Sequence, residues 1–257
     1  DRAAGDHPAA GAAHAVFDQG LLAEAGAAHH LHGFVGNLEA GGVAGELGDG
    51  RVIGRRQTFV GAGDGAFLMN GGRDPVPAAL STPEIDLYVD LRQQVQQFWE
   101  ETTSDVLTYR IAREFLRKNQ PRVLWIGIGQ SDDWAHARRY DLVLDYLHIA
   151  DQLLVDLWQT LQSMEPYRGR TTLIVTTDHG RGRTPADWAE HDAGIQGSQD
   201  IWIAIIGPDT PALGEAKNFP DVTQSDVAAT MLRYLGMDYR EFNPKAGPPV
   251  PGSLKAD

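Results

Sequence analysis

The sequence predicts an α/β protein with a mostly parallel central sheet flanked by helices. From about residue 83 onward, apolar runs of strand length alternate with longer helical stretches. The apolar runs are continuous and rich in β-branched residues, as expected for strands that are buried on both faces. The chain has 257 residues, of which 42% are hydrophobic. It is therefore long enough to bury a sizeable core of this kind.

Four stretches have helical composition and spacing. Residues 84–101 and 104–118 are rich in Gln, Glu, Arg and Leu. Residues 140–164 carry apolar side chains along one stripe, which predicts a long helix with one buried face. A last helix is predicted over residues 223–235, where Gly236 follows as a C-terminal cap.

Three apolar runs are predicted to be the strands of the sheet. They cover residues 123–128, 172–177 and 201–206, and the last is stopped by Gly207-Pro208. Since helical stretches lie among these runs, we expect the strands to pair mostly in parallel.

The first 82 residues differ in composition from residues 83–257, and we predict a boundary between the two segments. Residues 1–80 contain 17 Gly and 17 Ala but no Trp, Tyr or Lys. Small side chains bury little area, and glycine carries a high ordering cost. Two interpretations fit: a disordered segment, or a non-native translation of a GC-rich gene in the wrong frame. No carboxylate pattern accompanies His29-His30-Leu31-His32, which we interpret as an adventitious cluster.

One glycine-rich motif suggests a nucleotide-binding module, which is the weakest alternative. Residues 61–66 match the G-x-G-x-x-A fingerprint in form. The helix that must follow is missing, because the next residues include Gly71-Gly72, Pro75 and Pro77. Without a helix N-terminus there is no seat for a pyrophosphate.

Charge and cysteine content exclude several classes of partner and site. The formal net charge of −13 argues against nucleic acid or an anionic membrane as a partner. The absence of cysteine excludes disulfides and thiolate metal sites. No stretch of apolar residues has the length that a membrane span needs. Residues 1–15 lack the features of a signal peptide, and both cytoplasm and periplasm fit a cysteine-free chain.

Five polar side chains follow two of the predicted strands, where the ligand sites of parallel sheets lie. Asp132 and His136 come shortly after the strand over residues 123–128, and a helical turn there would put both on one face. Asp178 and His179 follow the strand over residues 172–177 directly, and His191 comes twelve residues later. Carboxylate and imidazole ligands suit zinc, manganese or iron. Asp133, Trp134, Arg139 and Trp188 are close in sequence, and we interpret them as packing and supporting residues.

This pattern resembles the metal-ligand series of the alkaline phosphatase superfamily. The shared order is Asp132-x-x-x-His136, an apolar strand running into Asp178-His179-Gly180, and then His191. The superfamily includes phosphatases, nucleotide pyrophosphatase/phosphodiesterases, sulfatases and cofactor-independent phosphoglycerate mutases. The resemblance covers about residues 83–252. Bacterial members of the superfamily also have segments similar to residues 132–141, 175–182, 207–211 and 223–230 of this sequence.

The resemblance implies a metal-dependent hydrolase that acts on small-molecule phosphate or sulfate esters. It implies two divalent ions, Zn²⁺ first, with Mn²⁺ or Fe as alternatives. Asp132, His136 and His191 match the ligands of one ion, and Asp178 and His179 match two ligands of the other. A serine or threonine nucleophile activated by the metals is implied as well.

The nucleophile region of the superfamily has no match in this sequence. That region is an N-terminal strand ending in a metal-binding Asp, followed by the nucleophile. The nearest imitations are Asp64-Gly65 and Thr82-Pro83, whose flanking residues match nothing else. The nucleophile therefore stays unassigned. The alternative interpretation is a non-catalytic, metal-binding remnant of the same superfamily.

Overall fold

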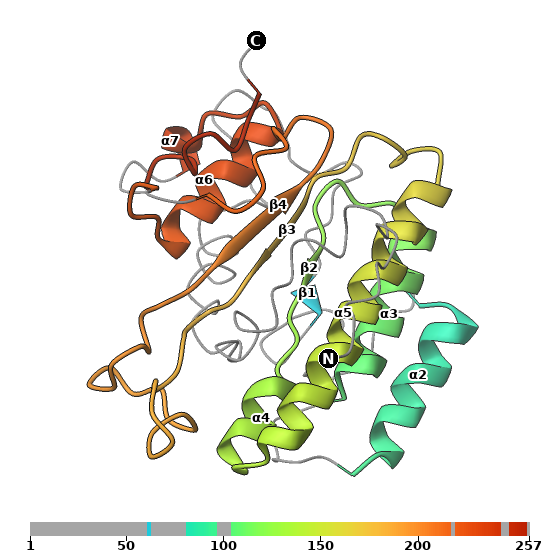
Figure 1. The fold of residues 1–257 in the computed structure, drawn as a ribbon. Helices are drawn as coiled ribbons and strands as arrows, with labels where there is room; N and C mark the ends of the chain where they lie inside the picture. Colours follow the sequence, from blue (N-terminus) through green and yellow to red (C-terminus); the bar gives the residue numbers. More distant parts are fainter. Residues whose placement is uncertain (1–60, 63–80, 97–103, 217–218, 243–246, 256–257) are drawn as a thin grey trace, which may run out of the picture.

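The protein is described here by a computed structural model that covers residues 61–62, 81–96, 104–216, 219–242 and 247–255. Its elements are β1 (Gly61–Ala62), α2 (Pro83–Gln94), α3 (Asp105–Asn119), β2 (Trp125–Ile126), α4 (Gln130–His136), α5 (Tyr140–Ser163), β3 (Leu173–Thr176), β4 (Ile203–Ile206), α6 (Gln224–Tyr234) and α7 (Tyr239–Phe242). In Figure 1 the helices α2 to α5 lie to one side of the strand pair β3–β4, and α6 and α7 lie to the other. From α2 onward the predicted helices and strands occur in the predicted order, and β3 is followed by β4 with no helix between them.

Local capping signals explain where the predicted helices begin and end. The side chain of Thr82 accepts a hydrogen bond from the backbone N–H of Ile85 at 3.1 Å, which starts α2. Thr223 and Asp226 form a capping box at the start of α6. Gly236 has a φ of 74°, the left-handed conformation expected of a C-terminal glycine cap. The first helix is shorter than predicted, because α2 ends at Gln94 and Val95 is extended.

The expectation of a mostly parallel sheet is not met among the described residues. β3 and β4 pair antiparallel, with Leu173 opposite Ile206. Within the described ranges, parallel pairing is limited to β1 and β2, with two residues in each strand. The connection explains the direction: a parallel return needs a crossover, usually a helix, and residues 177–202 form turns and bends with no helix. The strand residues are also half-buried, where burial on both faces was predicted.

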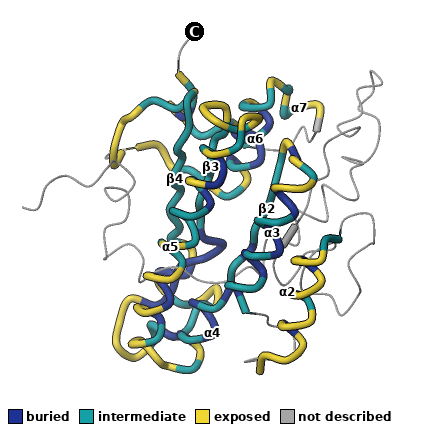
Figure 2. The backbone as a smooth tube through the Cα atoms, turned by 90° about the vertical axis from the view of Figure 1, so that its right-hand side faces the viewer, coloured by how far each residue is buried: buried dark blue, intermediate teal, exposed yellow. Residues whose placement is uncertain are grey.

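Two apolar clusters join α2 to α3 and α3 to α5, and Figure 2 colours the buried residues of the chain dark blue. Ile85 of α2 packs against Ile111, Ala112 and Phe115 of α3, and Leu124 and Ile126 lie against this cluster. A second cluster joins α3 to α5. Its buried members are Tyr109, Leu116, Leu157 and Leu161. The strand that leads toward the predicted site is therefore anchored on α3.

A polar group ties α3 to α5 beside the second cluster. The Asp156 carboxylate accepts hydrogen bonds from the Tyr109 hydroxyl at 2.5 Å and the Arg113 guanidinium at 2.8 Å. Burial, and then the hydrogen bond to Asp156, raises the pKa of Tyr109, so the phenol remains a donor at neutral pH.

Most of the glycine-rich N-terminal segment lies outside the described residues. The predicted boundary near residue 82, the two interpretations of residues 1–82, the cluster at His29 to His32 and the pair Asp64-Gly65 therefore stay predictions. Gly61 and Ala62 are described, and they pair with Trp125 and Ile126 of β2. No helix in the described ranges is long and apolar enough to cross a bilayer.

Candidate metal centre

The short helix α4 presents two predicted ligands on one face. Its first turn is closed by a backbone hydrogen bond from Asp132 to the carbonyl of Gly129 at 2.9 Å. Asp132 and His136 are four residues apart, and Asp132 Oδ2 lies 3.3 Å from His136 Nε2. The helical turn and the shared face expected from the sequence are therefore confirmed. Asp132 is buried, whereas the side chain of His136 is partly exposed.

The end of β3 presents the next two ligands. Asp178 and His179 are both buried. The Nδ1 atom of His179 lies 2.9 Å from the carbonyl oxygen of Gly180. A carbonyl can only accept, so Nδ1 donates this hydrogen bond and Nε2 is the ring atom that can face a cation. That Nε2 atom lies 4.0 Å from Asp132 Oδ1 and 3.7 Å from Asp178 Oδ2.

His191 is brought to the same place by the loop between β3 and β4. The backbone N–H of Gly182 donates to the carbonyl of Glu190 at 3.0 Å, which folds the loop back on itself. The His191 ring stacks on His179 with a centroid distance of 3.9 Å and an interplanar angle of 14°. Its Nε2 atom lies 3.7 Å from Asp132 Oδ1 and 2.9 Å from His136 Nε2.

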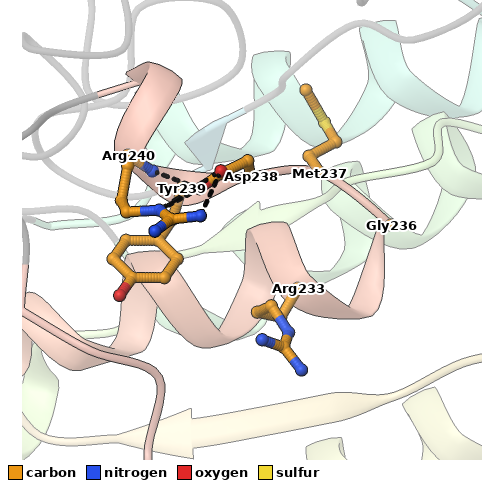
Figure 3. A pocket seen from close by; sticks show the side chains of 6 residues that line it. All are labelled: Arg233, Gly236, Met237, Asp238, Tyr239 and Arg240. Carbon is orange, nitrogen blue, oxygen red and sulfur yellow. Dashed lines mark hydrogen bonds and ion pairs between the residues drawn. The ribbon is translucent and has the colours of Figure 1, made fainter.

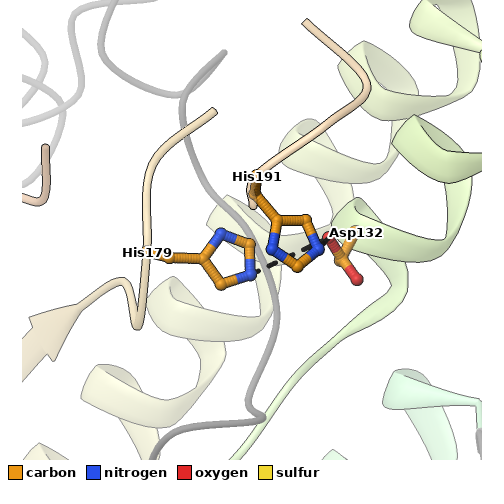
Figure 4. A group of neighbouring side chains, drawn as sticks. All are labelled: Asp132, His179 and His191. Carbon is orange, nitrogen blue, oxygen red and sulfur yellow. Dashed lines mark ion pairs between the residues drawn. The ribbon is translucent and has the colours of Figure 1, made fainter. Parts of the chain in front are cut away.

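All five predicted ligands therefore meet at one site, although they come from separate segments. Within it, one ligand atom each of Asp132, His179 and His191 lies within 4.8 Å of the others. Figure 4 shows these three side chains pointing toward one another. Two ligand atoms at about 2.1 Å from one ion are at most about 4.2 Å apart, so the separations of 3.7 and 4.0 Å from Asp132 suit a shared cation.

The protonation of His191 also suits a metal ligand. Burial, and after it the neighbouring His179 and Arg181, lowers the pKa of His191 to about 4. The imidazole is therefore neutral at pH 7, and a neutral ring is the form that donates a lone pair to a metal.

Arg181 is a site residue that the sequence interpretation missed. Its guanidinium is buried, pairs with Asp132 Oδ1 and donates to the carbonyl of Ala189 at 2.7 Å. Burial lowers the pKa of Arg181 to about 10, so the group is still charged at neutral pH. The available signal was its place two residues after His179. The sequence pattern could not reveal that the side chain turns inward.

Gln224, the first residue of α6, supports the β3 end from the other side. Its side-chain amide donates to the carbonyl of Thr177 at 3.2 Å and to the carbonyl of Asp178. Trp134 and Trp188 pack on a cluster of Ala135, Val143 and Leu147, as interpreted from the sequence. Arg139 instead forms an exposed ion pair with Asp141, so the supporting role expected for it is not seen.

A surface pocket between α6 and α7 does not share residues with the metal ligands. It is drawn in Figure 3, and its lining is Arg233, Gly236, Met237, Asp238, Tyr239 and Arg240. The guanidinium of Arg240 is already paired with the Asp238 carboxylate at 2.7 Å. Arg240 therefore contributes little free charge for recognition of an anionic ligand.

No protein-family model, curated protein or solved structure matches this chain. The chemistry of the site therefore has to be inferred from its side chains.

Gly180 allows a direct test of how the loop holds His179. A Cβ atom at Gly180 would collide with the backbone carbonyls of Gly197 and Asp200, and neither can move without shifting the loop. We expect Gly180→Ala to cost about 1–3 kcal/mol of unfolding free energy and to weaken zinc binding. The matched control is Gly194→Ala in the same loop, where a Cβ would meet nothing within 4 Å. Equal melting temperatures and zinc affinities for the two variants would contradict this role.

Proposed function

We propose that the chain is a hydrolase of phosphate or sulfate esters that depends on a divalent cation held by Asp132, His179 and His191. The observation that carries the proposal is the convergence of these three side chains, from α4 and from two positions of the loop after β3, to within 4.8 Å. His136 and Asp178 complete the group from either side. Zn²⁺ is the cation that best suits two imidazoles and a carboxylate.

Each side chain has a distinct part in this proposal. His179 offers Nε2, because its Nδ1 is bound to the carbonyl of Gly180. His191 stacks on His179 and is neutral at pH 7. The chemistry that a divalent cation supplies at such a site is Lewis-acid activation of a phosphoryl or sulfuryl oxygen.

Charge balance supports an anionic substrate. Asp132 and Asp178 bring two carboxylates to the site, and Arg181 brings one guanidinium. These groups leave one excess negative charge, which a divalent cation would reverse. Arg181 is paired with Asp132, so its charge offsets part of the negative charge of the ligand group.

We also propose membership of the alkaline phosphatase superfamily and, with it, a second metal ion and a parallel sheet. The support is that the residues carrying the resemblance, Asp132, His136, Asp178, His179 and His191, lie together. A crystal structure of the full chain grown with Zn²⁺ tests both parts. Two ions beside a parallel sheet would support membership, and β3–β4 as an isolated pair would contradict it.

A metal-binding remnant without catalysis is the second candidate. Thr82 is the nearest imitation of the nucleophile, and the structure gives its hydroxyl the role of capping α2. A chain of this kind would bind the cation through the same three residues but would not turn over esters.

The deciding experiment combines metal content with turnover. The full chain is stripped with a chelator, reloaded with Zn²⁺ or Mn²⁺, and assayed with p-nitrophenyl phosphate, its diester and p-nitrophenyl sulfate. For the wild-type chain we expect bound metal and turnover. Asp132→Asn should abolish both, while the exposed Asp145→Asn should leave both intact. Bound metal without turnover would support the non-catalytic remnant. A chain that holds no metal after reloading would contradict both candidates. Circular dichroism confirms that each variant is folded.

A further inference from the structure

Asp105 is a buried carboxylate that lies outside the group of predicted ligands. It is the first residue of α3, and 3% of its surface is exposed. Its Oδ2 atom accepts three hydrogen bonds, from the backbone N–H of Gly129 at 2.9 Å, the backbone N–H of Gln130 at 2.7 Å and the Tyr146 hydroxyl at 2.5 Å. Such bonds to a charged acceptor compensate the cost of burying it.

Two of the three donors belong to the beginning of α4. Gly129 is the residue before the helix, and Gln130 is its first residue. The contact is reciprocal, because the side-chain oxygen of Gln130 accepts the backbone N–H of Asp105 at 2.9 Å. The first N–H groups of a helix have no partner within it. A carboxylate at this point accepts hydrogen bonds from them and interacts favourably with the positive end of the helix dipole.

The helix α4, which Asp105 contacts, is too short to be stable on its own. α4 has seven residues, far below the roughly 12–15 at which isolated helices become even marginally stable. Its position is therefore set by tertiary contacts: Ala135 packs on Val143 and Leu147 of α5, and Asp105 binds the beginning of the helix. Asp132 lies two residues after Gln130, only about 3 Å further along the helix axis, so a shift at Gln130 reaches Asp132 almost undiminished.

We propose that Asp105 is a positioning residue of the metal centre. It links α3, α4 and, through Tyr146, α5, and it places Asp132 Oδ1 opposite His179 and His191. The inference rests on the proposed function in one respect, since it names a determinant of that same site. The anchoring of α4 itself can be measured without any metal.

The test compares Asp105→Asn with Asp156→Asn, which changes a second carboxylate between α3 and α5 whose side chain is 42% exposed. Asp156 also joins α3 to α5 by accepting two side-chain hydrogen bonds, but these come from Tyr109 and Arg113, not from α4. Asn cannot supply a charged oxygen to three donors. We expect Asp105→Asn to weaken Zn²⁺ affinity about 10- to 100-fold, the usual range for residues that orient ligands, while Asp156→Asn leaves it unchanged.

Two further readouts separate positioning from a general loss of stability. The visible spectrum of the Co²⁺-loaded chain should change in band position and intensity for Asp105→Asn only, because it reports ligand geometry. In the metal-free chain, amide hydrogen exchange over residues 130–136 should speed up for Asp105→Asn and not for Asp156→Asn. Tyr146→Phe removes one of the three donors and should give a smaller change of the same kind, which covers the case in which Asp105→Asn fails to fold.

The outcomes distinguish this inference from the proposed function. A wild-type chain that binds no Zn²⁺ contradicts the function, whereas the exchange rates in α4 still decide whether Asp105 anchors that helix. Equal affinities, spectra and exchange rates for the Asp105 and Asp156 variants would overturn the positioning role.

Discussion

Replacing His191 by alanine is expected to weaken Zn²⁺ binding by more than about 100-fold, because removal of residues that merely support ligands already costs about 10- to 100-fold. His191 is one of the three side chains whose ligand atoms lie within 4.8 Å of one another. Its ring also stacks on His179, so the second imidazole loses a neighbour that helps to hold it. Affinity is measured by titration against a competing chelator.

The weaker zinc binding of His191→Ala should also reduce the stability that the chain gains from zinc. For the wild-type chain, Zn²⁺ at 100 times its Kd adds about 2.7 kcal/mol to the free energy of unfolding. The His191→Ala variant should gain almost nothing from the same zinc concentration. The exposed His148→Ala on α5 is the control for removal of a histidine from the chain. If His191→Ala and His148→Ala bind zinc equally well, His191 is not a ligand.

Phe115→Ala is expected to have the largest effect on stability, about 3–5 kcal/mol, the range for deleting a buried aromatic ring. Phe115 is fully buried at the centre of the cluster that joins α2 and α3. Leu124 and Ile126, which precede the loop to α4, pack on the same cluster and leave it little freedom to collapse. Urea unfolding followed by circular dichroism measures the change.

The matched control is Phe219→Ala, which removes the same side chain from a position that is 39% exposed. We expect a change within about 0.5 kcal/mol there, as for most surface substitutions. Similar costs at Phe115 and Phe219 would contradict the position of the core between α2 and α3.

The helices were predictable because their signals are local. The apolar stripe over residues 140–164 predicts α5 to within one residue at its end, and Gly236 marks the end of α6. The direction of β3 and β4 was not predictable in the same way. The β-branched runs define where each strand lies, whereas the pairing direction depends on how residues 177–202 return the chain.

The site was predictable in its residues but not in its arrangement. Carboxylate and imidazole side chains after two strand ends indicated Asp132, His136, Asp178, His179 and His191, and the structure brings these residues together. The resemblance assigns His179 to a different ion from Asp132 and His191, yet the ligand atoms of these three residues lie within 4.8 Å of one another. Their grouping, the tautomer of His179 and the inward turn of Arg181 all depend on the folded loop after β3, which no spacing rule describes.

Anomalous diffraction from crystals of the full chain grown with Zn²⁺ tests the metal centre most directly. We expect a strong peak at the zinc edge about 2.0–2.2 Å from Asp132 Oδ1, His179 Nε2 and His191 Nε2. Zinc peaks confined to other histidines, with none among these three atoms, would contradict it.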